Sequence, residues 1–158
     1  MLSGTALREG RVIPGVSFTD PRSGATVDLW GFRQRRALVL VFLHDRCAAC
    51  RAFARELGTI ADDLDWAGAL ARAVLSDRED LPIPALLDPG QTGTRRLLGE
   101  NADLPVIVIV DRYGAAMVSY PAAGHRFPTA QEVAASVVHL AIQCPECGVS
   151  QWPAPDEG

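Results

Sequence analysis

Two runs of consecutive apolar residues stand out along the chain, at Ala37–Leu43 and Val106–Val110. Neither run alternates between apolar and polar side chains, and both contain valine or isoleucine at several positions. This pattern is typical of strands that are covered on both faces, as in a parallel or mixed sheet between helices. Shorter runs at Ala71–Leu75 and Ala85–Leu87 predict two further buried strands. The hydrophobic pattern therefore predicts a sheet in the interior of the molecule.

The apolar spacing changes from continuous to helical after Cys47. Apolar side chains then recur every three to four residues, at Ala49, Phe53, Leu57 and Ile60. This period predicts a helix from near Cys47 to about Ala61. A short helix is expected between a cap at Thr92 or Thr94 and a stop at Gly99.

The ends of the predicted domain carry a hairpin and a helix. Val16–Phe18 and Ala25–Leu29 are short extended runs, and Asp20–Gly24 between them has the composition of a hairpin turn. Asp111–Gly114 is a second hairpin turn, after which Ala115–Tyr120 returns as a strand. A last helix is expected at about residues 129–142, with an apolar face formed by Val133, Val137, Leu140 and Ala141.

The order of these elements predicts an α/β fold with a central mixed sheet, helices on both faces and an N-terminal β-hairpin. The length of 158 residues suits one domain, and 48% hydrophobic with 22% charged residues is typical of a globular chain. We expect the domain to span residues 1–142 and a tail to span residues 143–158.

Charge and hydropathy exclude some classes of partner. All 15 basic residues are arginine, and the net charge is −4. This balance gives no general attraction to nucleic acid or to an anionic membrane surface. The chain has no apolar run of the roughly 18 residues that a membrane span needs, and no signal-peptide core near its start. We therefore expect a cytoplasmic protein, in which thiols are kept reduced.

The sequence Cys47-Ala-Ala-Cys50 lies where a buried strand passes into a helix. The first turn of a helix has unpaired N–H groups and the positive end of the helix dipole. These stabilise a thiolate, so that the pKa of a cysteine there falls from about 8.5 into a range of roughly 3.5–7.5. Two intervening residues allow the sulfurs to form a disulfide. The motif predicts a redox-active dithiol, although two buried thiols or half of a zinc site are alternatives.

The stretch from Leu38 through the CAAC motif to Phe53 resembles the active-site strand and helix of thioredoxin-like redoxins. The similarity is strongest to the AhpC/TSA-type redoxins and the TlpA/ResA-like thiol-disulfide oxidoreductases. The opening at Pro14–Leu29 resembles their N-terminal hairpin, and Leu104–Gly114 resembles their strand that begins with a cis-proline. The resemblance covers residues 12–140. It implies a thioredoxin-like fold.

The resemblance also implies roles for individual residues. Cys47 would be the nucleophile, Cys50 the resolving thiol and Pro105 the cis-proline beside them. The reaction would need no cofactor; its partners would be a disulfide-containing protein or small molecule and a separate reductant. A peroxide-reducing redoxin is the alternative enzyme. Peroxiredoxins carry Thr or Ser three residues before their reactive cysteine, where this chain has His44.

Other departures from the family pattern concern the surroundings of the dithiol. Arg46 replaces the usual aromatic residue before the first cysteine, and its charge is expected to lie near the thiolate. Val41 stands where thioredoxin has a buried acid, so a general acid–base group is not identified; Asp45 and Glu56 are the nearby carboxylates.

A second pair, Cys144-Pro-Glu-Cys147, resembles one knuckle of a rubredoxin or zinc-ribbon site. A knuckle supplies two ligands, whereas a structural zinc site needs four. Cys47 and Cys50 are poor candidates for the other two, because a helix of about 14 residues would carry Cys144 roughly 20 Å away from them. Three interpretations stay open: a zinc site shared between two chains of a homodimer, a second redox pair, or two idle thiols. The first of these leads to a third functional class, a non-enzymatic binding protein that holds zinc.

Two histidines complete the set of candidates. His44 is close enough to Cys47 in sequence to tune its thiolate. His125 lies in a loop rich in glycine and proline, and the sequence suggests no partner for it.

Overall fold

The computed structural model describes residues 7–32 and 35–142, so that Cys144 and Cys147 lie outside the described residues. The strands are β1 Arg11–Val12, β2 Ser17–Thr19, β3 Thr26–Asp28, β4 Ala37–Phe42, β5 Ala69–Leu75, β6 Ala85–Leu87, β7 Val106–Val110 and β8 Ala115–Pro121. The α-helices are α1 Ala48–Thr59, α2 Ala61–Trp66, α3 Thr92–Leu98 and α4 Ala130–Ala141. Three short 3-10 helices are η1 Leu29–Phe32, η2 Pro89–Gln91 and η3 Ala123–His125.

The strands form one mixed sheet in the order β1-β8-β7-β4-β5-β6-β2-β3. Strands β4, β5 and β6 run parallel, as expected for strands joined by helical or long connections. Strand β7 pairs antiparallel with β4, and the hairpin partner β8 pairs antiparallel with β7. The N-terminal hairpin of β2 and β3 extends the sheet beyond β6 through a single pairing of Thr19 with Leu87. This arrangement confirms the predicted mixed sheet and N-terminal hairpin.

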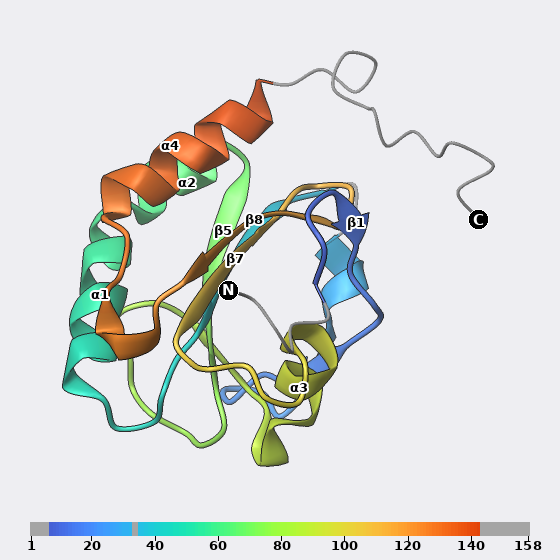
Figure 1. The fold of residues 1–158 in the computed structure, drawn as a ribbon, viewed down its shortest axis with the longest axis vertical. Helices are drawn as coiled ribbons and strands as arrows, with labels where there is room; N and C mark the ends of the chain where they lie inside the picture. The colour runs from blue at the N-terminus through green and yellow to red at the C-terminus, as the bar shows by residue number, and fades with distance from the viewer. Residues whose placement is uncertain (1–6, 33–34, 143–158) are drawn as a thin grey trace.

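Strand β4 is central, and its side chains divide between two hydrophobic cores. Val39 and Val41 face a core that includes residues of α1, α2 and α4, whereas Leu38, Leu40 and Phe42 face a core that includes α3 and the N-terminal segment. Figure 1 shows α1, α2 and α4 along one side of the sheet and α3 on the other. Both faces of β4 are therefore covered, which explains why its sequence is apolar at every position.

The helix that begins within the CAAC motif ends earlier than the spacing predicts. Helix α1 stops at Thr59, and α2 starts at Ala61 after a break at Ile60, whose backbone φ of −110° is not helical. Leu64 continues the apolar face by packing into the same core as Leu57. The apolar period therefore extends across two helices, because the break turns the chain without removing its buried side.

The cap of α3 also differs from the prediction. Neither Thr92 nor Thr94 caps this helix; the buried carboxylate of Asp88 accepts hydrogen bonds from the backbone N–H groups of Gly93 and Thr94 at 3.0 and 2.6 Å. The hydroxyl of Thr94 donates a third bond to the same carboxylate at 2.6 Å. A carboxylate next to the N-terminus of a helix satisfies its unpaired N–H groups.

None of the helices within the described residues is long and apolar enough to cross a membrane.

Candidate redox site

The dithiol lies at the C-terminal end of β4, where the chain turns into α1. Cys47 is the N-cap residue of α1, with the extended backbone angles that such a position requires. The backbone N–H of Cys50 donates a hydrogen bond to Cys47 Sγ at 3.2 Å. Cys47 thus occupies the N-cap position that serine or aspartate often occupies in other helices. Its sulfur accepts a hydrogen bond from one of the N–H groups that have no partner within the helix.

The two cysteines are both reduced, but their surroundings differ. Cys47 is half-buried, whereas the side chain of Cys50 is only 2% exposed. Burial is the largest of the causes that together raise the pKa of the Cys50 thiol to about 12, and the neighbouring Cys47 and Glu79 add to it. Cys50 is therefore held as a protonated thiol beneath a sulfur that solvent can reach. The two thiols of the motif thus differ in their exposure to solvent.

Asp45 anchors the turn before the dithiol to the end of β5. Its carboxylate accepts hydrogen bonds from the backbone N–H groups of Ser76 and Asp77 at 3.2 and 3.3 Å, and from the Ser76 hydroxyl. The side chain is therefore occupied in fixing the loop. Glu56, the other carboxylate considered from the sequence, is exposed on α1.

Glu79 is a further acidic residue of this region that the sequence pattern did not single out. Its carboxylate accepts a bond from the backbone N–H of Arg46 at 2.8 Å and forms an ion pair with Arg51 at 2.6 Å. The Glu79 side chain is only 10% exposed. It links the loop after β5 to both sides of the CAAC motif.

The side chain of Arg46, whose charge the sequence places near the thiolate, forms an ion pair at the surface. Its guanidinium group pairs with Asp77 at 3.4 Å, and both side chains are well exposed. The backbone of Arg46 has a φ of 52°, in the left-handed region. Its N–H bond to Glu79 therefore fixes the turn, while its positive charge is directed to a neighbouring carboxylate.

The peptide bond between Leu104 and Pro105 is cis, which confirms the geometry expected from the resemblance. His44, three residues before Cys47, donates a hydrogen bond from Nε2 to the carbonyl oxygen of Leu104 at 2.9 Å. The carbonyl oxygen of Pro105 in turn accepts a bond from the N–H of Ala122 at 2.9 Å. The cis-proline segment is thereby joined to the turn before the dithiol and to the loop after β8.

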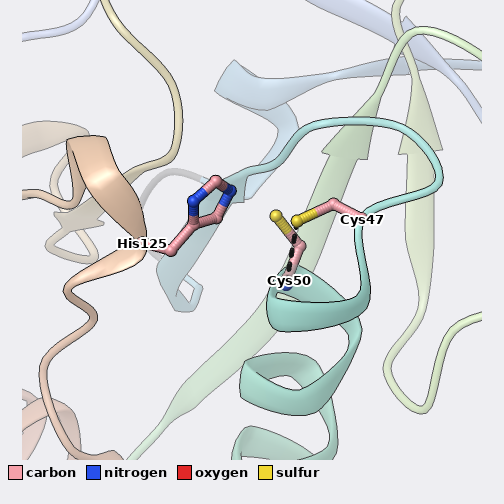
Figure 2. Close-up of side chains that lie close together, drawn as sticks. All are labelled: Cys47, Cys50 and His125. Atoms are coloured by element: carbon pink, nitrogen blue, oxygen red, sulfur yellow. Dashed lines mark hydrogen bonds between the residues drawn. The ribbon is translucent and has the colours of Figure 1, made fainter.

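His125 corrects the sequence interpretation, which assigned it no partner. Its ring nitrogen and the sulfurs of Cys47 and Cys50 all lie within 4.8 Å of one another. Figure 2 shows the imidazole of His125 directed toward the two sulfurs from a segment that lies across the dithiol from α1. The ring also lies 5.4 Å from the ring of His44 and 6.2 Å from the ring of Phe127, centroid to centroid.

The contact between His125 and the dithiol joins residues that are far apart in the sequence. His125 follows β8, whose partner β7 pairs with β4, and β4 leads to Cys47. The sequence of the loop that carries His125 indicates a turn, and it contains no pattern that predicts the contact with the dithiol. The order of strands in a thioredoxin-like sheet was the information that could have suggested it.

Of the residues predicted for the site, the structure brings Cys47 and Cys50 together and links Pro105 to them through Leu104 and His44. The predicted roles of Cys144 and Cys147 fall outside the described residues. Among the described residues, Cys47, Cys50 and His125 are the group of side chains that could hold a metal ion.

Comparison with known proteins places the fold but gives no match in sequence. No protein-family model and no curated protein matches the chain. Among solved structures, the chain is similar to a mitochondrial 2-Cys peroxiredoxin from Plasmodium falciparum, with a TM-score of 0.72 and 13% identity over 84% of this chain and 94% of that one.

The chain is similar to the same degree to solved structures of thiol-disulfide proteins. A secreted thiol-disulfide isomerase from Corynebacterium glutamicum has a TM-score of 0.70 and 19% identity over 83% of this chain and 86% of that one. A thiol:disulfide interchange protein from Bacteroides sp. has a TM-score of 0.67 and 17% identity over 92% and 97% of the two chains. The fold is therefore that of thioredoxin-like redoxins, with a CAAC dithiol at the strand-to-helix junction of β4 and α1.

Proposed function

We propose that the protein is a thiol-disulfide oxidoreductase in which Cys47 is the nucleophile and Cys50 the resolving thiol. One observation carries this proposal: a half-buried sulfur at the N-terminus of α1 lies within 4.8 Å of a buried thiol one helical turn later. The structural similarity to thiol-disulfide proteins supports the proposal through the fold.

The first step is an attack of the Cys47 thiolate on a disulfide of the substrate. A bond forms between Cys47 Sγ and one substrate sulfur, the substrate disulfide breaks, and the other sulfur leaves as a thiolate. The N–H of Cys50, already 3.2 Å from Cys47 Sγ, stabilises negative charge on that atom before the attack. The half-buried position of Cys47 leaves it open to a protein or small-molecule disulfide.

In the second step Cys50 loses its proton and attacks Cys47 Sγ. The Cys47–Cys50 disulfide forms, the mixed disulfide breaks, and the second substrate sulfur leaves. The protons of both cysteines end on the two substrate thiols, so that the substrate gains the two electrons that the enzyme dithiol loses. A separate reductant then has to return the enzyme to the dithiol state.

The test is the reduction of insulin by dithiothreitol, followed by the precipitation of the released insulin chain. We expect the protein to accelerate the reaction, and Cys47→Ser and Cys50→Ser each to lower turnover to the uncatalysed rate. A Cys144→Ser/Cys147→Ser variant is the matched control and should keep the activity. Full activity of Cys47→Ser would contradict the proposal.

A peroxide reductase is the second candidate, because a peroxiredoxin is among the similar structures. In that case the Cys47 thiolate would attack a peroxide oxygen, the O–O bond would break with release of an alcohol or water, and Cys47 would become a sulfenic acid; Cys50 would then form the disulfide with loss of water. Peroxide consumption, together with a sulfenic acid trapped at Cys47 in Cys50→Ser, would favour it over disulfide reduction.

A further inference from the structure

Three donor groups with affinity for soft metal ions meet at the mouth of the dithiol site. The two sulfurs come from the start of α1, and the imidazole comes from η3, more than 70 residues later. All three donor atoms lie within 4.8 Å of one another. Figure 2 shows the three side chains gathered at this point. Cys47 is half-buried and His125 is exposed, so an ion from solvent can reach the space between them.

The backbone at His125 is held in place by a hydrogen bond of its own and by the packing of a nearby side chain. The residue has a φ of 63°, in the left-handed region, and its N–H donates a hydrogen bond to the carbonyl oxygen of Ala122 at 2.8 Å. Phe127, two residues further along the chain, stacks on Phe53 of α1 with ring centroids 4.5 Å apart. The segment that carries the imidazole is therefore packed against the helix that carries the sulfurs.

The distances suit coordination after a small adjustment. Metal–sulfur bonds of about 2.3 Å and metal–nitrogen bonds of about 2.0–2.1 Å place neighbouring donors roughly 3.5–4 Å apart. The observed limit of 4.8 Å therefore requires the donors to close by at most about 1.3 Å, which rotation of the exposed imidazole and of the Cys47 side chain can supply.

The kind and number of donors favour one ion. Thiolate ligands select soft ions such as Cu(I) and Zn(II), and hard ions such as Mg²⁺ prefer oxygen. Structural zinc sites have four protein ligands, and zinc held by two cysteines and one histidine takes water as a fourth ligand, whereas the described residues supply three donors here. Cu(I) forms three-coordinate complexes with such donors, so the three side chains would complete its coordination without a fourth ligand.

We propose that the reduced protein binds one Cu(I) ion through Cys47 Sγ, Cys50 Sγ and a ring nitrogen of His125. Binding releases the two thiol protons and leaves the oxidation state of the metal and of the sulfurs unchanged. The disulfide form lacks both thiolates, so oxidation of the pair removes the site. The proposal goes beyond the redox function and does not rest on it, because it requires the dithiol but no turnover.

The test is an anaerobic titration with Cu(I) against a chromophoric chelator such as bicinchoninate. It uses the full chain with Cys144→Ser and Cys147→Ser, so that the second pair cannot compete. We expect one Cu(I) per reduced chain and no binding by the disulfide form. His125→Asn should lower the affinity by roughly tenfold or more, since even the loss of a group that only orients a ligand costs 10–100-fold.

The matched control is His139→Asn, which removes an exposed imidazole from α4. This variant should bind Cu(I) as tightly as the parent chain. Equal affinity of His125→Asn and the parent, or equal binding by the disulfide form, would overturn the proposal. A zinc titration that depends on His125, with a Cu(I) titration that does not, would overturn the choice of ion.

X-ray absorption at the copper edge provides a second readout that needs no variant at the site. The proposal predicts two sulfur neighbours and one nitrogen neighbour. A shell made of sulfur alone would contradict the role of His125, whatever the folding of the His125 variant.

Discussion

Cys47 and Cys50 are separated by two alanines, yet α1 gives them opposite environments. Cys47 precedes the first helical turn and receives an N–H hydrogen bond, while Cys50 faces the core with Phe53 and Leu57. Burial favours the neutral form of an acid, which is the main reason why the pKa of Cys50 is raised to about 12. One helical turn therefore separates an accessible sulfur from a protected one.

This difference predicts how Cys50 reacts with iodoacetamide. In a Cys47→Ser/Cys144→Ser/Cys147→Ser chain, the Cys47 contributions are removed but burial, the largest cause of the raised pKa, remains. The thiolate fraction below the pKa grows tenfold per pH unit, so we expect the alkylation rate to keep rising about tenfold per unit through pH 10. Mass spectrometry of quenched samples gives the rate.

The matched control retains only Cys47, through Cys50→Ser/Cys144→Ser/Cys147→Ser. We expect this chain to react at pH 7 roughly 100-fold faster than the chain that retains only Cys50, because Cys50 is buried and its raised pKa keeps it protonated. A plateau of Cys50 alkylation near pH 8.5, as for an ordinary exposed thiol, would contradict the assigned asymmetry.

At the residue scale, the sequence predicted the dithiol and the cis bond but not the contacts around them. The CAAC motif is local, and its place between an apolar run and a helical period is visible in the sequence. Glu79 and His125 reach the site from separate loops, and neither loop has a pattern that reports its neighbours. Asp45 was visible as a carboxylate, but its role in holding the β5 loop depends on Ser76.

At the scale of elements, close packing between α3 and the N-terminal hairpin is a strong constraint on the sequence. A Cβ atom built at Gly93 would lie 2.7 Å from Phe18 Cε1 and 2.8 Å from Val16 Cγ1. Both of these side chains are buried, at 3% and 4% exposure. The hairpin and the helix therefore meet at a position where only glycine fits.

Gly93→Ala has two opposite effects of similar size on the stability of the fold. Alanine in place of glycine favours the helix by about 1 kcal/mol, whereas overpacking of a buried contact costs about 1–3 kcal/mol. Because Phe18 and Val16 are both buried, we expect the overpacking to outweigh the helix propensity, with a net loss of up to about 2 kcal/mol in the free energy of unfolding. Urea denaturation measures this loss.

Gly31→Ala is the control for this prediction, because a Cβ at Gly31 meets no atom within 4 Å. Its unfolding free energy should stay within about 0.5 kcal/mol of the parent. A stabilised Gly93→Ala would show that the hairpin yields and that helix propensity dominates at this position.

The elements themselves were mostly predictable, and the exceptions have physical reasons. Strands β4 and β7 carry apolar residues throughout, so their burial on two faces was evident from the sequence. Strand β1 has only two residues, both exposed, and its pairing with β8 left no hydrophobic signal. Helix α2 continues the apolar period of α1, which concealed the break between them.

At the scale of the molecule, the sheet order explains how the site is assembled. Strand β4 lies between β5 and β7, so the loops that follow β4, β5 and β8 and the loop that precedes β7 meet around the start of α1. This order could be expected from the resemblance to thioredoxin-like redoxins, but not from the hydrophobic pattern. The cytoplasmic location stays a prediction, as do the zinc and homodimer interpretations of the Cys144–Cys147 pair.

The domain boundary predicted from the sequence can be tested with a shortened chain. The last helix α4 ends at Ala141, and Val133 and Val137 on it are fully buried in the core with α1 and α2. A chain that ends at Ile142 retains all of these contacts, so we expect an unchanged urea midpoint and unchanged insulin reduction. A chain that ends at Thr129 should fail to fold and serves as the comparison. Loss of activity in the 142-residue chain alone would assign the catalytic function partly to the tail.

The central claim is that Cys47 attacks the substrate disulfide and that Cys50 resolves the product. The most direct test mixes Cys50→Ser with a peptide disulfide and locates the trapped adduct by peptide mass mapping. We expect a stable mixed disulfide at Cys47, and no adduct at the CAAC motif for Cys47→Ser, which retains only the buried Cys50 of that motif. An adduct at Cys50 in the Cys47→Ser chain, with none at Cys47 in the Cys50→Ser chain, would reverse the assigned roles and contradict this account.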